Sequence, residues 1–279
     1  MTLFRAVLVG DSRLVGFDRY VRPTNLNLDF VIKRGACVED LVEPTVQLLQ
    51  QKEFRNADIV VVKLVAGINN FTSIISHSEG KELTLSHTSE LGVFQKIVAF
   101  KERVKKVCPQ ALVGFATIPT LSFQKNIQHR IEVGKLRKSK YSSGEILRFQ
   151  QELDEKLVQI NARIKFDNSR KQTGHSKGCL TVSLHRDITR ESKRRNRGGK
   201  LRVVTRNTFN QLYDGLHAKS ELKLKWFERL CKALKSEISF TLKDRAASVR
   251  VTIEEEVTEE QTSRSDSWDF KRNKLEQNV

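Results

Sequence analysis

Cysteine is scarce in this sequence and thinly spread. The four cysteines stand at Cys37, Cys108, Cys179 and Cys231 and include no Cys-x-x-Cys pair. Isolated thiols of this kind argue against a zinc site and against a disulfide framework, so we interpret all four as reduced. The histidines show no metal-ligand spacing either. The sequence therefore predicts a protein without a metal or another cofactor.

Long apolar runs are also missing. No segment approaches the roughly 18 to 20 apolar residues that span a bilayer. The apolar run at the N-terminus is interrupted by Asp11 and is too short for a signal peptide. We therefore expect no membrane span and an intracellular location, cytoplasmic or nuclear.

Acidic residues are in the minority, with 33 Asp and Glu against 50 Lys and Arg and a formal net charge of +17. A positive surplus of this size attracts polyanions, and RNA or DNA is the partner that it suggests. A single charge run is more often a solvated loop. Two basic runs supply the candidate nucleic-acid contacts, which are Lys135, Arg137, Lys138, Lys140, Lys193, Arg194, Arg195, Arg197 and Lys200.

Short apolar runs alternate with segments of helical spacing almost throughout the chain. The runs expected to form strands are 4–10, 29–33, 57–65, 111–118 and 179–184, and the segments expected to form helices are 38–51, 89–107, 144–166 and 219–235. Runs that are apolar at nearly every position are typical of parallel strands buried on both faces. The pattern predicts an α/β fold, a three-layer sandwich with a central, mostly parallel five-stranded sheet.

Two stretches depart from this alternation. Residues 163–206 contain fourteen Lys or Arg and three acids, which indicates a long basic insertion. Beyond 237, Val249, Val251 and Ile253 alternate with polar residues as in a half-buried strand, and an acidic, polar tail follows. We therefore expect an α/β domain over 1–237 with an insertion around 163–206, and a C-terminal extension over 238–279 that could support oligomerisation.

Two short motifs could supply the chemistry of a nucleophilic enzyme. Gly10-Asp11-Ser12 falls where the first strand ends, which would offer the Ser12 hydroxyl at the carboxyl edge of the sheet. Asp214-x-x-His217 precedes the last expected helix. A carboxylate there can orient the imidazole so that its other nitrogen takes the serine proton. Ser12, Asp214 and His217 are therefore the candidate catalytic triad.

With these motifs the chain resembles the SGNH, or GDSL, hydrolase superfamily, whose fold is flavodoxin-like. Four blocks occur in the family's order, namely Gly10-Asp11-Ser12, Gly35, Gly67-Ile68-Asn69-Asn70 and Asp214-x-x-His217. The resemblance implies a serine esterase in which Ser12, Gly35 and Asn69 bind the oxyanion. Asn70 stands where the family usually has Asp, and Arg13 stands where a hydrophobic residue is commoner.

Other interpretations remain open at this point. Gly174 to Gly178 fits a Gly-x-Ser-x-Gly pattern, but no strand is expected before Ser176, so we interpret that serine as a loop residue. Diverged SGNH-like domains occur in open reading frames of mobile elements, including proteins that bind nucleic acid. The alternatives to an esterase are thus a basic nucleic-acid-binding protein of mobile-element or viral type, and a structural or assembly subunit, each with a vestigial or secondary active site.

Overall fold

The computed structural model describes residues 3–20, 26–172, 175, 177–195, 201–244 and 246. The chain divides into two compact units, Met1–Ile238 and Ser239–Val279. In the second unit, residues 239–244 are helical. The strand expected around Val249 to Ile253 and the acidic tail lie outside the described residues.

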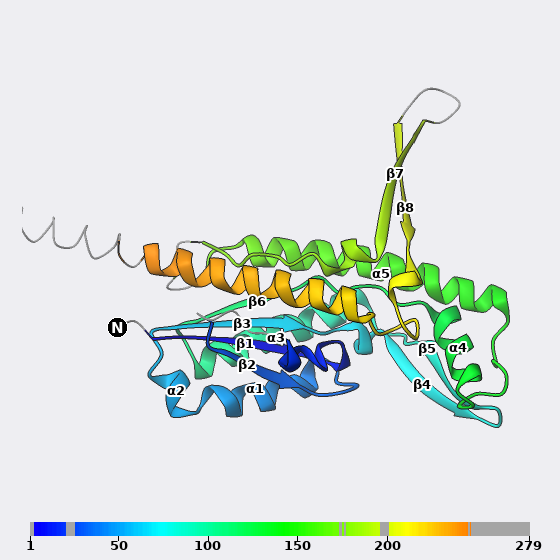
Figure 1. The fold of residues 1–279 in the computed structure, drawn as a ribbon, viewed down its shortest axis with the longest axis horizontal. Coiled ribbons are helices and arrows are strands. Elements are labelled where there is room, and N and C mark those ends of the chain that lie inside the picture. The colour runs from blue at the N-terminus through cyan, green and yellow to red at the C-terminus, as the bar shows by residue number, and fades with distance from the viewer. Residues whose placement is uncertain are drawn as a thin grey trace, which may run out of the picture. The chain divides into compact units, whose positions relative to one another are not determined.

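A parallel sheet forms the centre of the first unit (Figure 1). Its strands are β1 (Phe4–Gly10), β2 (Leu28–Ile32), β3 (Ile59–Val65) and β6 (Ala111–Phe115), in the order β2-β1-β3-β6. Every residue of β3 and β6 is buried, as expected for strands covered on both faces. The predicted α/β sandwich around a mostly parallel sheet is confirmed.

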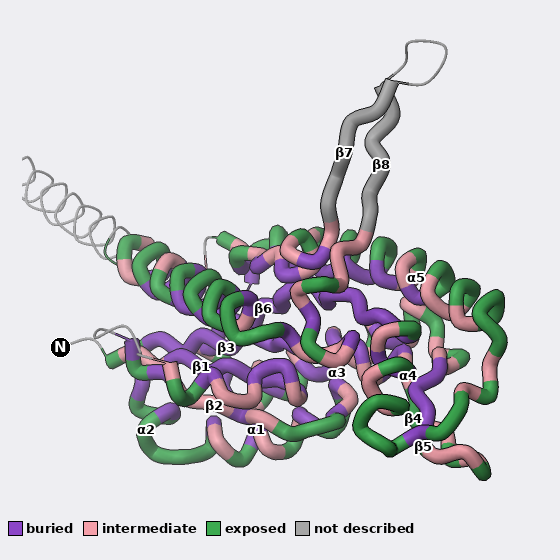
Figure 2. The backbone as a smooth tube through the Cα atoms, turned by 45° about the vertical axis from the view of Figure 1, so that its right-hand side comes forward, coloured by how far each residue is buried: buried purple, intermediate pink, exposed green. Residues whose placement is uncertain are grey.

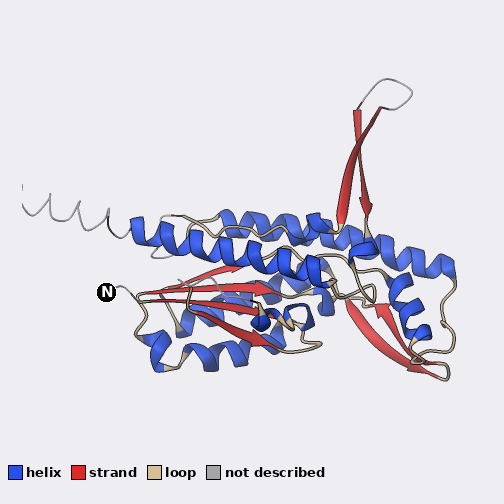
Figure 3. Ribbon diagram, in the orientation of Figure 1, coloured by secondary structure: helices blue, strands red, loops and turns tan. Residues whose placement is uncertain are grey.

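Helices cover both faces of this sheet (Figure 3). One layer contains α1 (Val42–Leu49), α2 (Lys52–Arg55) and α3 (Glu90–Val107), while the helix over residues 220–238 lies on the opposite face. The helix α5 (Ser143–Ser169) begins in a capping box, in which Ser142 and Glu145 satisfy each other's backbone amides. All four predicted helices are present, and most of their ends lie within a few residues of the prediction, while the last helix continues well past residue 235.

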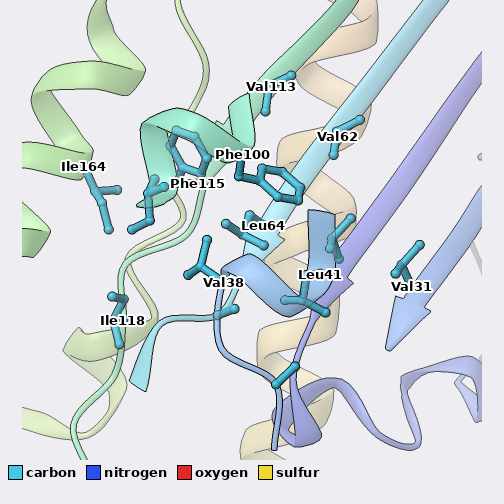
Figure 4. Packing of buried hydrophobic residues seen from close by; sticks show 14 of the residues in the cluster. Val31, Val38, Leu41, Val62, Leu64, Phe100, Val113, Phe115, Ile118 and Ile164 are labelled. Atoms are coloured by element: carbon cyan, nitrogen blue, oxygen red, sulfur yellow. The ribbon is translucent and has the colours of Figure 1, made fainter. Parts of the chain in front are cut away.

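The hydrophobic core lies between the sheet and the layer of α1 and α3 (Figure 4). Val62, Leu64, Val113 and Phe115 project from the strands toward Phe100 of α3. All five side chains are at most 2% exposed. Figure 2 shows burial along the backbone, with buried strands inside and exposed residues on the outer faces of the helices.

Side-chain amides cover the free edge of the sheet along β6. Asn168 of α5 accepts a hydrogen bond from the Phe115 amide at 3.0 Å and donates one to the Phe115 carbonyl at 2.7 Å. Two further amides bind backbone groups in the same two-bond manner, Asn161 at Ile118 and Gln172 at Val113. These groups are the ones that a further strand would have used.

The prediction of a fifth strand at Cys179–Leu184 is therefore wrong for the described residues, and the sheet has four strands. This segment bonds mainly to side chains. The Leu180 carbonyl accepts from Lys63 Nζ at 3.0 Å, and the Leu180 amide donates to Glu237 Oε1 at 2.6 Å. The apolar pattern of the run reflects its burial and not a strand.

Three elements were not expected from the sequence. They are the hairpin of β4 (Thr72–His77) and β5 (Gly80–Leu85), the helix α4 (Phe123–Glu132), and the hairpin of β7 (Thr189–Arg195) and β8 (Leu201–Asn207). The segment 163–206, expected to be a basic insertion, begins inside α5 and contains most of the second hairpin.

Candidate active site

Ser12 lies directly beyond the carboxyl end of β1. The strand ends at Gly10, and Ser12 begins a single 3-10 turn that ends at Leu14. Asp11 caps this turn, because its Oδ1 accepts a hydrogen bond from the Arg13 amide at 2.9 Å. The strand end and the cap together fix the backbone that carries the Ser12 hydroxyl at the sheet edge.

Asp214 and His217 belong to one tight loop before the helix that starts at residue 220. Asp214 Oδ1 accepts from the amides of Leu216 at 3.0 Å and His217 at 2.7 Å. Asp214 Oδ2 lies 2.7 Å from His217 Nδ1. The carboxylate thus holds the loop backbone with one oxygen and the imidazole with the other.

The loop and the β1 turn meet across 205 positions of sequence, where His217 Nε2 lies 2.9 Å from Ser12 Oγ. Burial raises the pKa of the Asp214 carboxyl. The hydrogen bonds from His217 and Leu216 and the charge of His217 outweigh burial, so its pKa lies well below its usual range. A charged Asp214 favours a proton on Nδ1, which leaves Nε2 able to accept the Ser12 proton.

Residues that sequence reasoning missed anchor the loop from the α4 side. The Ser122 amide donates to the Gly215 carbonyl at 2.7 Å, and Asn126 Nδ2 donates to the Asp214 carbonyl at 3.0 Å. Lys125 Nζ donates to the Leu212 carbonyl at 2.7 Å. These contacts join segments about 90 residues apart, and no local pattern in the sequence signals them.

The second and third sequence blocks lie at the same sheet edge. Gly35 follows β2 in a turn, with φ of +69°. Asn69 Nδ2 donates to the Ala36 carbonyl at 2.9 Å and makes a longer contact of 3.4 Å with Asp11 Oδ2. Asn69 therefore connects the turn after β2 with the residue that precedes Ser12.

Asn70 supports this loop although the family usually has Asp there. Its Oδ1 accepts from the Val38 amide at 3.0 Å, and its Nδ2 donates to Glu39 Oε2 at 2.8 Å. Lys96 in turn pairs with Glu39. An amide makes both contacts at once, whereas an ionised carboxylate could not donate to Glu39. Asn70 therefore holds the third block against the segment that follows β2.

Arg13 is 2% exposed and lies among acidic groups. Burial lowers the pKa of its guanidinium, while the charges of Asp11 and Asp214 raise it. Burial raises the pKa of Asp11 against the opposing effect of Arg13. Within the described part of the chain, Arg13 Nε and Nη2 have no hydrogen-bond partner. Arg13 thus supplies a buried positive charge within the turn that begins at Ser12.

The candidate nucleic-acid residues lie in separate elements. Lys135, Arg137, Lys138 and Lys140 are exposed in the segment between α4 and α5. Lys193, Arg194 and Arg195 belong to β7. Arg197 and Lys200 lie outside the described residues, as does Ser176 of the Gly-x-Ser-x-Gly pattern.

In the part of the chain that the structure describes, no group of three or more His, Cys, Asp or Glu could hold a metal ion, and no helix could cross a membrane.

No family model matches this sequence, and no curated protein matches it. Solved structures align with the chain at low identity. A member of the lipolytic protein G-D-S-L family from Veillonella parvula is 10% identical, with a TM-score of 0.49 over 83% of this chain and 98% of that chain. The psychrotrophic esterase EstA from Pseudoalteromonas sp. is 12% identical, with a TM-score of 0.44 over 84% and 99%. A carbohydrate esterase family 3 protein from Talaromyces cellulolyticus is 13% identical, with a TM-score of 0.44 over 86% and 99%. Their descriptions name lipolytic and esterase proteins.

Proposed function

We propose that this chain is a serine esterase, or acyl hydrolase, with Ser12 as nucleophile, His217 as general base and Asp214 as the residue that orients His217. The observation that carries the proposal is the chain of contacts from Ser12 Oγ to His217 Nε2 at 2.9 Å and from His217 Nδ1 to Asp214 Oδ2 at 2.7 Å. Nucleophile, base and orienting acid at hydrogen-bond distance are what acyl transfer requires.

The reaction would proceed in two halves. As Ser12 Oγ attacks the ester carbonyl carbon, its proton moves to His217 Nε2 and the carbonyl oxygen becomes an oxyanion. When the carbonyl re-forms, the bond to the alcohol oxygen breaks, and His217 returns the proton to the leaving alcohol. Water then attacks the acyl-enzyme by the same route, which releases the acid and restores Ser12.

The oxyanion would be bound by the amides of Ser12 and Gly35 and by Asn69 Nδ2. The 2.9 Å bond to the Ala36 carbonyl holds the Asn69 side chain, while the 3.4 Å contact with Asp11 is weak and leaves the second Nδ2 hydrogen available to a developing oxyanion. A preorganised donor of this kind contributes about 3 kcal/mol to the stabilisation of the transition state.

The test is labelling by a fluorophosphonate probe together with hydrolysis of p-nitrophenyl acetate. We expect the wild type to label and turn over, and Ser12→Ala to do neither. Ser176→Ala is the matched control, because Ser176 lies in a segment whose sequence matches the Gly-x-Ser-x-Gly nucleophile pattern. It should behave as the wild type. Absence of labelling in the wild type, or labelling that persists in Ser12→Ala, would contradict the proposal.

A further inference from the structure

The β7–β8 hairpin projects away from α5 and the rest of the first unit (Figure 1). Its strands pair antiparallel over seven residue pairs, from Thr189↔Asn207 to Arg195↔Leu201. Both ends are held by the body. Thr189 Oγ1 donates to the His185 carbonyl at 3.2 Å, and Asn207 Nδ2 donates to Asp154 Oδ2 at 2.6 Å. The hairpin is thus an arm with a fixed base.

The two strands carry six Lys or Arg and one Glu. Pairing places Arg190 opposite Arg206 and Arg194 opposite Arg202. Since directly opposed residues share a face and alternate residues return to it, these four arginines occupy positions on one face of the ribbon. The two Arg–Arg pairs of the arm therefore belong to the same side.

Such a face is unfavourable for the arm by itself. Like charges directly opposite each other destabilise a strand pair, and a two-stranded hairpin that does not pack on a third layer is marginally stable in water. An anionic partner that neutralises both arginine pairs would remove this repulsion. The charge pattern therefore suits a bound polyanion better than a free arm in solvent.

We propose that this hairpin is an arm that binds duplex nucleic acid, with Arg190, Arg194, Arg202 and Arg206 contacting phosphates along a groove. Arginine fits phosphate because its planar guanidinium can donate two parallel hydrogen bonds. A two-stranded β-ribbon fits the major groove of B-form DNA, which is about 12 Å wide. Nucleic-acid binding by this arm is a function separate from ester hydrolysis and does not depend on it.

The composition of the arm favours a duplex over a single strand. Proteins that hold single strands stack the bases on aromatic side chains, and residues 189–207 contain no aromatic residue. The major groove of A-form RNA is deep and narrow. We therefore expect B-form DNA to bind more tightly than a single strand or an RNA duplex of the same sequence.

The first test compares the two faces of the arm in the full chain. The arginine-face variant is Arg194→Gln with Arg202→Gln, and the opposite-face variant is Lys193→Gln with Arg195→Gln, so that each removes two charges from the arm. Fluorescence anisotropy with a short DNA duplex should show an affinity loss of about 10-fold or more for the first variant, and a slope of log K against log salt that is smaller by about 2. The second variant should change both quantities much less. Equal losses would overturn the assignment to the arginine face.

The second test separates the arm from the overall charge of the protein. One variant changes all four face arginines to Gln, and its control changes Lys135, Arg137, Lys138 and Lys140 to Gln. We expect the arm variant to lose most duplex binding and the control to keep most of it, with unchanged circular dichroism for both. Equal loss in both would show attraction by net charge alone. Tighter binding to the single strand, or to phosphatidylserine vesicles that the duplex does not displace, would also overturn the proposal.

Discussion

Asn168 and Phe115 make two hydrogen bonds that replace a strand at the edge of the sheet. The amide of Asn168 binds both the N–H and the C=O of Phe115, at 3.0 and 2.7 Å. An open strand edge invites pairing with another chain, and a covered edge does not. The long helix α5 therefore ends the sheet at β6 as well as packing on the core.

Removal of the Asn168 side chain should destabilise the fold. Asn168→Ala leaves two buried backbone groups of Phe115 without partners, and each costs about 1 to 3 kcal/mol. We expect the free energy of unfolding in urea to fall by about 2 to 6 kcal/mol. Gln151→Ala, at an exposed position of the same helix, should change it by less than about 0.5 kcal/mol. A small effect at Asn168 would show that water or a shifted segment satisfies the edge.

Asp214→Asn should preserve the loop and remove most of the activity. The Asn oxygen can still accept from the Leu216 and His217 amides, but it favours the wrong imidazole tautomer. We expect p-nitrophenyl acetate turnover to fall by about 10³- to 10⁴-fold. A variant that kept more than about a tenth of wild-type turnover would argue against the proposed role.

The same substitution should change the acid sensitivity of the fold. The pKa of Asp214 is lower in the folded protein than its ordinary value of 3.8, so the unfolded state takes up the proton first as pH falls. Its stabilising contribution is present above about pH 4 and is lost as pH falls through the folded pKa. The difference in unfolding free energy between wild type and Asp214→Asn should therefore shrink toward low pH, as measured by urea unfolding at several pH values.

Much of this fold was predictable because its signals are local. Four of the five strand predictions are correct, since runs such as Ile59–Val65 are apolar at nearly every position. The motifs at Ser12 and His217 could be identified because each joins an element boundary to reactive side chains. The predicted fifth strand failed because Asn161, Asn168 and Gln172 bind across the sheet edge, and contacts between distant segments leave no periodic pattern. The β7–β8 hairpin was missed because its charged residues obscure the alternation of a strand.

Asn69 and Asn70 are neighbours that should differ in their effects. Asn69→Ala removes a proposed oxyanion donor, so we expect kcat to fall by about 10²- to 10³-fold with little change in KM. Asn70→Ala removes the contacts with Val38 and Glu39 and should mainly lower the melting temperature. Steady-state kinetics and thermal unfolding of both variants check the contrast. A large loss of stability with an unchanged kcat in Asn69→Ala would assign it a structural role only.

Gly215 sits where the loop of Asp214 and His217 meets α4. Its φ is +80°, and an added Cβ would lie 2.6 Å from the Ser122 carbonyl oxygen and 2.6 Å from the Asn126 amide nitrogen. Gly215→Ala should therefore displace the loop and abolish most fluorophosphonate labelling. Gly16→Ala is the control, because its φ is +90° but a Cβ there meets nothing within 4 Å. It should cost about 1 kcal/mol of stability and leave labelling intact. Equal labelling of the two variants would contradict this account.

Lys63 and Glu237 form a buried ion pair between β3 and the helix over residues 220–238, with 2.6 Å between Nζ and Oε1 and side chains that are 0% and 1% exposed. Glu237→Gln leaves the Lys63 ammonium buried without its counter-charge and should lower the unfolding free energy by roughly 3 to 5 kcal/mol. Adding Lys63→Met removes that charge, while the glutamine introduced at position 237 can still accept from the Leu180 amide as Glu237 does.

The double variant should therefore be more stable than Glu237→Gln alone, by on the order of 2 kcal/mol in urea unfolding. This result would mean that the pair is required mainly because each charge needs the other, and that an apolar residue can replace Lys63 beneath the Leu180 segment. If the two substitutions simply added their costs, Lys63 would instead act through its separate bond to the Leu180 carbonyl at 3.0 Å, and that bond would hold the segment on the sheet.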